Sequence, residues 1–193
     1  MTTILLARHG ETDWNREGRF QGWADPPLNR TGLDQAVELS VRLMAEDLAA
    51  VYSSPLRRAL ETADVVAASH GLQPVTLDAL REVDVGSWSG LTRAEIEQRF
   101  PDQYARWLDY GQGWEDGETY EAMAGRVVPA LLEVAAAHDG ARLLAVAHGG
   151  PIRAAAAAAD GITYAEARRR DPVVGNATVL ELAAEAGILR RLD

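Results

Sequence analysis

Two histidines follow short apolar segments that have the composition of buried strands. His9 comes one residue after the apolar segment 4–7, and His148 comes directly after residues 143–147. Short apolar runs bounded by glycine are typical of buried strands. Since ligands of open α/β sheets bind beyond the carboxyl ends of the strands, we expect both imidazoles at one edge of a single sheet.

An imidazole at such an edge can act as a nucleophile toward phosphorus. His9 must then be neutral, with one ring nitrogen bare and the other donating a hydrogen bond that fixes the tautomer. We expect a backbone carbonyl near Gly10 to accept that bond, and Gly10 to let the main chain approach the ring. His148 has a different expected role. Protonated, it would donate to a phosphoryl oxygen, beside the free N–H groups of a helix that begins at Pro151.

Arginine must supply the permanent positive charge, because the sequence contains no lysine. The guanidinium group presents a planar fork of donors that matches pairs of phosphate oxygens. Arg8 and one member of the pair Arg57 and Arg58 can clamp a phosphoryl group in this way. Neighbouring residues on a helix point about 100° apart, so only one of the pair is expected to face the site. A surface position beside Glu61 suits Arg57.

Ester cleavage also requires a proton for the leaving alkoxide and later a base for water. One carboxylic acid can do both. The segment 80–90 offers two candidates, Glu82 and Asp84. Spacing alone leaves both open, and a surface ion pair is the ordinary alternative for either.

The elements that must position these residues alternate between strand and helix. Strands are expected at residues 4–7, 49–52, 75–77, 143–147, 177–182 and 188–192. Helices are expected at residues 33–46 (capped by Thr31), 55–69, 92–100, 102–110, 120–138 and 151–159. This order predicts an α/β fold with a mostly parallel sheet covered on both faces. A length of 193 residues with 47% hydrophobic content predicts one domain spanning residues 1–193.

Composition argues against several function classes. The net charge of −10 disfavours nucleic acid and anionic membranes as partners. Without cysteine or lysine, thiolate and Schiff-base chemistry are excluded. The chain shows neither a signal peptide nor an apolar stretch of membrane-spanning length, so we expect a cytoplasmic protein. Its four histidines form no paired metal-binding motif, so neither a metal ion nor another cofactor is expected.

Taken together, these residues resemble the histidine phosphatase superfamily, the branch that includes cofactor-dependent phosphoglycerate mutases. The likeness spans nearly the whole chain and implies a three-layer α/β/α sandwich. The segments that carry it are residues 8–12 (Arg-His-Gly-Glu-Thr), Asn15, Gln21 and Gly22, Asp25, Leu28, Gly32, residues 54–59, Glu82, residues 86–90, and His148 with Gly149.

The resemblance assigns roles to individual residues. It implies that His9 is the nucleophile and that Glu82, rather than Asp84, is the proton donor. Arg8, Arg58 and His148 match the phosphate pocket. The residues implied to contact phosphate or substrate are Asn15, Gln21, Gly22, Glu118 and Gly149.

The implied activity is that of a metal-independent phosphomonoesterase acting on small phosphorylated metabolites, as a monomer or homodimer. Mutases of the family carry a His-Tyr-Gly tract after the glutamate and a longer middle insertion. This chain is shorter and has residues 85–92 instead, as in the broad-specificity, α-ribazole and fructose-2,6-bisphosphatase branches. A cofactor-dependent phosphoglycerate mutase and a non-catalytic module that binds a phosphorylated ligand are the alternatives.

The sequence leaves the pocket beyond the phosphate undetermined. Its loops are expected at residues 14–27 and 104–121. The aromatic residues that either line it or only pack are Trp23, Trp107, Tyr110 and Trp114.

Overall fold

The centre of the computed structural model, which describes residues 1–171 and 174–192, is a six-stranded sheet in the order β3-β2-β4-β1-β5-β6. The strands are β1 (Thr2–Arg8), β2 (Leu48–Ser53), β3 (Pro74–Thr76), β4 (Arg142–Ala147), β5 (Val179–Glu185) and β6 (Ile188–Arg191). The first four strands in the chain pair in parallel, as predicted. The last two add an antiparallel edge, because β5 runs against β1 and β6 against β5.

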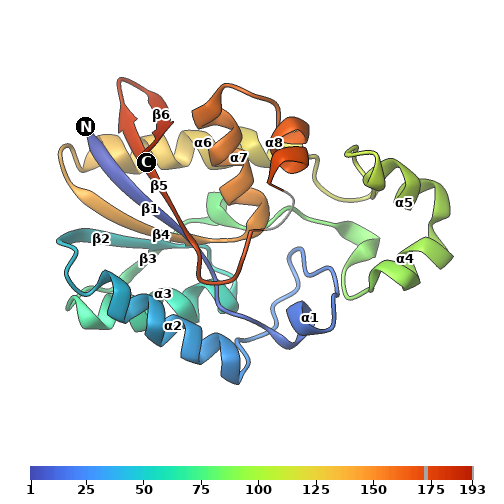
Figure 1. Cartoon of the computed structure of the whole chain (residues 1–193), viewed down its shortest axis with the longest axis horizontal. Coiled ribbons are helices and arrows are strands. Elements are labelled where there is room, and N and C mark those ends of the chain that lie inside the picture. Colours follow the sequence, from blue (N-terminus) through green and yellow to red (C-terminus); the bar gives the residue numbers. More distant parts are fainter. Residues whose placement is uncertain (172–173, 193) are drawn as a thin grey trace.

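Helices cover both faces of this sheet, which confirms the three-layer arrangement (Figure 1). On one face lie α2 (Arg30–Leu43) and α3 (Arg57–Ser69), and on the other α6 (Tyr120–Ala137) and α7 (Gly149–Asp160). Side chains of a strand alternate between faces. Accordingly, Ile4 and Leu6 of β1 join the core under α6 and α7, while Leu5 joins the core under α2 and α3.

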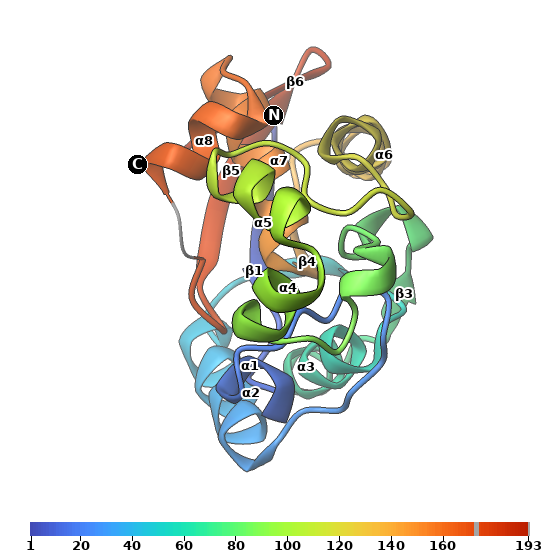
Figure 2. The same cartoon turned by 90° about the vertical axis from the view of Figure 1, so that its right-hand side faces the viewer.

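Smaller helices lie outside the three layers. They are α1 (Asp13–Arg16), α4 (Arg93–Arg99), α5 (Pro101–Leu108), α8 (Tyr164–Arg170) and the 3₁₀ turns η1 (Asp78–Leu80) and η2 (Gly86–Trp88). The sequence had indicated α4 and α5 but neither α1 nor α8. Figures 1 and 2 show α4 and α5 beyond the carboxyl ends of β1 and β4. These two helices therefore border the sheet edge where the histidines emerge.

Helix boundaries follow the capping groups. α2 begins three residues before its expected start, because Asn29 rather than Thr31 is the cap and its side chain accepts from Gly32 N at 2.8 Å. α7 begins at Gly149 with His148 as its cap, not at Pro151. The expected Thr92–Glu95 capping box does start α4. In the part of the chain that the structure describes, no helix is both long and apolar enough to cross a bilayer.

Candidate active site

His9 and His148 lie side by side, as the sheet order requires. Arg8 and Ala147 are register partners at the ends of β1 and β4, so the next residue of each strand emerges at the same edge. The two ring centroids are 5.1 Å apart, and His9 N donates to Ala147 O at 3.1 Å. Both imidazoles are buried. The predicted meeting of the two histidines is confirmed.

The ring of His9 is held in one tautomer. Its Nδ1 lies 2.6 Å from Gly10 O, a carbonyl that can only accept, so Nδ1 carries the proton and Nε2 is bare. Burial lowers the pKa of His9 well below its usual value, the charges of Arg58 and Arg8 lower it further, and the bond to Gly10 opposes them. The ring is therefore a neutral imidazole at neutral pH.

The need for glycine at position 10 has a different cause from the one expected. A Cβ there would overlap the carbonyl oxygen of Gly32, not the His9 ring. A Cβ on Gly32 would in turn overlap Glu11 O. The two glycines let the first turn of α2 pack directly against the loop that carries His9.

Arg58 faces the pocket and Arg57 faces solvent. The Arg58 side chain is 1% exposed and donates to Ala24 O at 2.7 Å and Gly22 O at 2.9 Å. Burial lowers the pKa of Arg58 to about 10, so it stays charged at neutral pH. Arg57 pairs with Glu61 at 2.6 Å on the surface. The two arginines divide as their helical spacing predicted.

Arg8 supplies a second, partly buried cation beside His9. It lines the pocket and donates to Val174 O, and its Nε has no hydrogen-bond partner among the described residues. Burial lowers the pKa of Arg8, and Glu82 across the pocket opposes that effect. Arg8 and Arg58 thus concentrate positive charge around His9 in an acidic protein.

His148 is a buried imidazole with a lowered pKa. Burial is the main cause, and Arg58, His9 and Arg8 lower this pKa further. The expectation of a protonated ring concerned the state beside a phosphoryl group, whose negative charge would raise the pKa. Its Nε2 lies 2.8 Å from Ser54 Oγ, which already accepts from Leu56 N at 3.3 Å. His148 is fully buried and does not line the pocket, and its Nδ1 has no partner among the described residues.

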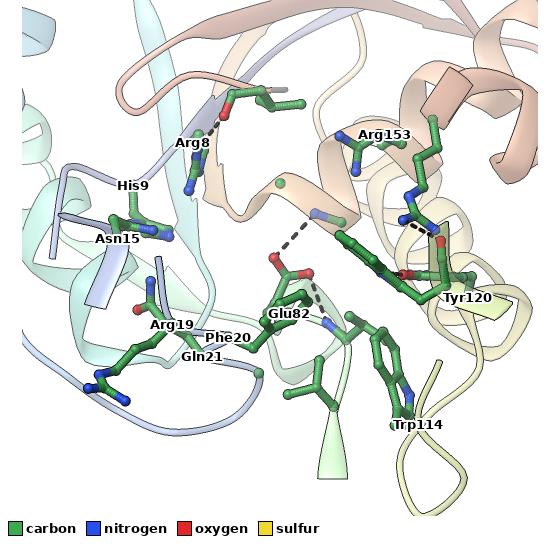
Figure 3. Close-up of a pocket in the computed structure, with 18 of the residues that line it drawn as sticks. Arg8, His9, Asn15, Arg19, Phe20, Gln21, Glu82, Trp114, Tyr120 and Arg153 are labelled. Atoms are coloured by element: carbon green, nitrogen blue, oxygen red, sulfur yellow. Dashed lines mark hydrogen bonds between the residues drawn. The ribbon is translucent and has the colours of Figure 1, made fainter. Parts of the chain in front are cut away.

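Glu82 projects into the pocket opposite His9, whereas Asp84 does not line it (Figure 3). Its Oε1 accepts from Val83 N at 2.9 Å, and its Oε2 from Gly150 N at 3.3 Å. A Cβ on Gly150 would overlap the carboxylate. The sequence analysis did not single out Gly150 and so missed that it makes room for Glu82.

Glu118, expected to contact substrate, does not line the pocket. Its carboxylate instead forms a bidentate ion pair with Arg126, at 2.7 Å to Nε and 2.6 Å to Nη2. Arg126 also donates to the backbone carbonyls of Ala79, Arg81 and Glu82. The Glu118–Arg126 pair therefore holds the segment that presents Glu82.

The remaining expected contacts do line the pocket: Asn15, Gln21, Gly22 and Gly149. Asn15 Oδ1 accepts from Thr12 N at 3.0 Å, which leaves the amide nitrogen to donate to an anion. The side-chain oxygen of Gln21 is buried without a hydrogen-bond partner in the described chain.

The pocket has a volume of about 310 Å³ and an aromatic end. Figure 3 shows His9 and Asn15 at one end and Trp114 and Tyr120 at the other. The sequence left undecided whether four aromatic residues line the pocket or only pack. Trp107 and Trp114 line it, while Trp23 and Tyr110 do not. Several lining residues were not predicted: Arg93 from α4, Arg153 from α7, and Tyr164 and Arg168 from α8. Arg19, Phe20 and Tyr120 also line the pocket, and they fall within the two segments expected to form it, 14–27 and 104–121.

Sequence could have indicated one of these missed residues. Arg153 lies four residues after Gly149 and therefore on the same face of α7. The others come from α4 and α8, helices whose approach to the site depends on packing. Within residues 1–171 and 174–192, no three His, Asp or Glu side chains are grouped so as to hold a metal ion.

Comparisons with known proteins extend over nearly the whole chain. Residues 4–193 match the family model described as histidine phosphatase superfamily (branch 1). A metal-independent phosphoserine phosphatase from Arabidopsis thaliana is 39% identical over 159 residues, which cover 80% of this chain and 67% of the relative.

A solved structure and a mutase are also similar to this chain. The structure of a mycobacterial glucosyl-3-phosphoglycerate phosphatase with VO3 has a TM-score of 0.88 and 30% identity, and the match covers 97% of this chain and 95% of that one. A 2,3-bisphosphoglycerate-dependent phosphoglycerate mutase from Methylorubrum extorquens is 30% identical over 194 residues, covering 96% of this chain and 92% of the relative.

Proposed function

The chain belongs to branch 1 of the histidine phosphatase superfamily, and we propose that it hydrolyses phosphate monoesters of small metabolites through a phosphohistidine on His9. The observation that carries this proposal is the state of the His9 ring. It is neutral, with Nδ1 bonded to Gly10 O and Nε2 bare, and two arginines, the buried Arg58 and the partly buried Arg8, lie beside it. A neutral imidazole among fixed cations suits attack on an anionic phosphoryl group.

In the first half-reaction, His9 Nε2 attacks phosphorus. The P–N bond forms as the ester P–O bond breaks, and Glu82 gives its proton to the departing alkoxide. Arg8, Arg58 and the Asn15 amide bind the phosphoryl oxygens. His148 adds a neutral donor: when Ser54 donates to Nε2, Nδ1 carries the proton and can bind a further oxygen.

In the second half-reaction, ionised Glu82 takes a proton from water as the water oxygen attacks phosphorus. The P–N bond breaks, its electron pair returns to Nε2, and inorganic phosphate leaves. Glu82 is again protonated and His9 again neutral, so the cycle closes. The backbone N–H of Val83 and of Gly150 donate to the Glu82 carboxylate and hold it in place for both transfers.

The names of relatives support a small-metabolite substrate. The Arabidopsis thaliana relative is a phosphoserine phosphatase, and the mycobacterial structure is a glucosyl-3-phosphoglycerate phosphatase. The mutase relative keeps phosphoglycerate mutase as the second candidate. The two activities differ in whether water or a second alcohol accepts the phosphoryl group from His9.

The test is phosphate release from a panel of monoesters, including p-nitrophenyl phosphate and 3-phosphoglycerate, in the presence of EDTA. We expect release that survives EDTA and is lost in His9→Ala. Brief reaction with ³²P-labelled substrate should label the wild type but not His9→Ala. The matched control is His70→Ala, because His70 caps α3 and does not line the pocket.

Other outcomes would contradict the proposal. Full activity in His9→Ala would exclude the covalent route, and loss of activity with EDTA would point to a metal-dependent reaction. Conversion of 3-phosphoglycerate to its 2-isomer, without phosphate release, would establish the mutase instead.

A further inference from the structure

The pocket carries more positive charge than one phosphoryl group requires. Six arginines and a single carboxylate, Glu82, line it, in a chain whose net charge is −10. Arg8 and Arg58 flank His9. The four arginines beyond them are Arg19, Arg93, Arg153 and Arg168. Like charges gathered in one pocket repel each other, and an anionic ligand that binds there relieves this repulsion.

Two of the four differ from the others in their surroundings. Arg19 is neutralised, because it pairs with Glu17 at 2.7 Å and Glu95 at 3.1 Å. Arg93 is on the exposed surface of α4, over the edge of the pocket. Arg153 and Arg168 instead come from adjacent helices, α7 and α8, and Arg168 lies at the aromatic end of the pocket, over Trp107.

The guanidinium group of Arg153 is held in place by a backbone carbonyl and a tyrosine hydroxyl. Its guanidinium donates to Asp171 O twice at 3.2 Å and to Tyr164 Oη at 3.3 Å. It lies close enough to Arg8 and to Arg168 to lower the pKa of both. Figure 3 shows Arg8 and Arg153 on the same side of the pocket. A ligand held by Arg8 therefore extends past Arg153.

Arg168 is held in place by neutral groups. It donates to Trp107 O at 2.8 Å and lies 4.3 Å above the Trp107 ring. In the described part of the chain, no carboxylate lies within ion-pair distance of it. Burial is the main cause that lowers the pKa of Arg168. A partly buried cation held by carbonyls and rings, as Arg168 is, keeps its charge available for an anion.

We propose that Arg153 and Arg168 form a subsite for a second oxyanion on the substrate, a carboxylate or a second phosphoryl group. The substrate class is then the phosphate monoester of a short alcohol that itself carries an anionic group. The stacked rings of Tyr120 and Tyr164, 4.4 Å apart, lie beside the connecting carbon atoms. A pocket of about 310 Å³ limits that connection to a few atoms. This inference rests on the proposed phosphatase function.

The test compares esters that differ only in the second anion. 3-Phosphoglycerate is compared with glycerol 3-phosphate, which has a hydroxymethyl group in place of the carboxylate. Fructose 1,6-bisphosphate is compared with fructose 6-phosphate for a second phosphoryl group. We expect kcat/KM for phosphate release to be at least about tenfold higher, in one pair, for the ester that carries the second anionic group. The pair that shows the preference identifies the second anion.

The variants assign this preference to the two arginines. Arg153→Gln and Arg168→Gln should each reduce the ratio of kcat/KM values, and the double variant should bring it close to one. Arg57→Gln is the matched control, because it removes one positive charge from the surface outside the pocket. It should leave the ratio unchanged.

Binding to His9→Ala, measured by calorimetry, gives a readout that needs no turnover. The ester that carries the second anionic group should bind more tightly than its partner, and the Arg153→Gln exchange should reduce the difference. Hydrolysis of p-nitrophenyl phosphate without preference in either pair would overturn this inference and leave the phosphatase function standing. A preference unchanged in the double variant would do the same. If no ester is hydrolysed, the phosphatase function fails, and equal binding of both esters of each pair overturns the subsite independently.

Discussion

The carboxylate of Glu82 lies directly against the backbone of Gly150. The amide N–H of Gly150 donates to Glu82 Oε2 at 3.3 Å, and a Cβ at position 150 would overlap Oε1. Glu82 is therefore positioned by the first turn of α7, the helix that His148 caps. One short segment thus contributes to both the phosphate end and the acid.

Gly150→Ala should reduce catalysis without removing any catalytic group. The new methyl group displaces the Glu82 carboxylate, so we expect kcat for alkyl phosphates to fall by about tenfold or more, and less for p-nitrophenyl phosphate. Gly125→Ala is the control, because nothing lies within 4 Å of a Cβ there. Equal activity of the two variants would show that Glu82 has room to adjust.

Glu82→Gln should separate substrates by leaving group. An alkoxide needs a proton when it departs, whereas p-nitrophenolate leaves without one, so the loss should be about 10² or more for alkyl esters and much smaller for the aryl ester. The measurement is kcat across a series of leaving-group pKa values. A loss of the same size for every ester would argue against Glu82 as the acid.

Ser54→Ala should disturb the tautomer of His148. Ser54 Oγ accepts from Leu56 N and lies 2.8 Å from His148 Nε2, an arrangement in which the hydroxyl donates and Nδ1 keeps the proton. Without the hydroxyl, Nε2 is buried without a partner, at a cost of about 1–3 kcal/mol in the free energy of unfolding. We expect kcat to fall and the ¹⁵N shifts of the ring to change.

Ser53→Ala is the matched control for this prediction. Ser53 is an equally buried serine whose hydroxyl donates to Ser54 O rather than to the imidazole. If both variants kept the wild-type ¹⁵N pattern for His148, Ser54 would not set the tautomer.

Stability should decrease as the pH falls through about 6.5. The pKa values of His9 and His148 are both lowered in the folded protein, so below pH 6.5 the unfolded chain binds protons that the folded chain does not. Each ring should cost up to about 1.4 kcal/mol of stability between pH 7.5 and 5.5. Urea unfolding at the two pH values measures the loss.

The variant His9→Gln should lose its share of this pH dependence. Carboxylates add little in the same window, because their ordinary pKa values lie near 4. A wild type equally stable at both pH values would contradict the burial of two neutral imidazoles.

Several features of the site followed from local sequence. The apolar segments before His9 and His148 predicted two strands of one sheet, and parallel strands end at the same edge, so the two rings had to meet. The 100° step between helix neighbours separated Arg57 from Arg58. The capping box at Thr92 fixed the start of α4. Each of these relationships depends on spacing along the chain or on the direction of a strand.

Tertiary packing decided the rest. Burial beside Arg58 lowered the pKa of His148, a shift that the sequence did not predict. Arg126, distant in sequence from Glu82, forms an ion pair with Glu118 and also donates to the backbone carbonyl of Glu82. Glu118 therefore lies against the segment that carries Glu82 and not in the pocket. Arg153 and Arg168 reached the site only because α7 and α8 pack beside it. The sequence therefore determined which groups could do chemistry and at which sheet edge they would lie. The protonation states, and the place of Arg153 and Arg168 in the pocket, depended on burial and on distances between segments far apart in the chain.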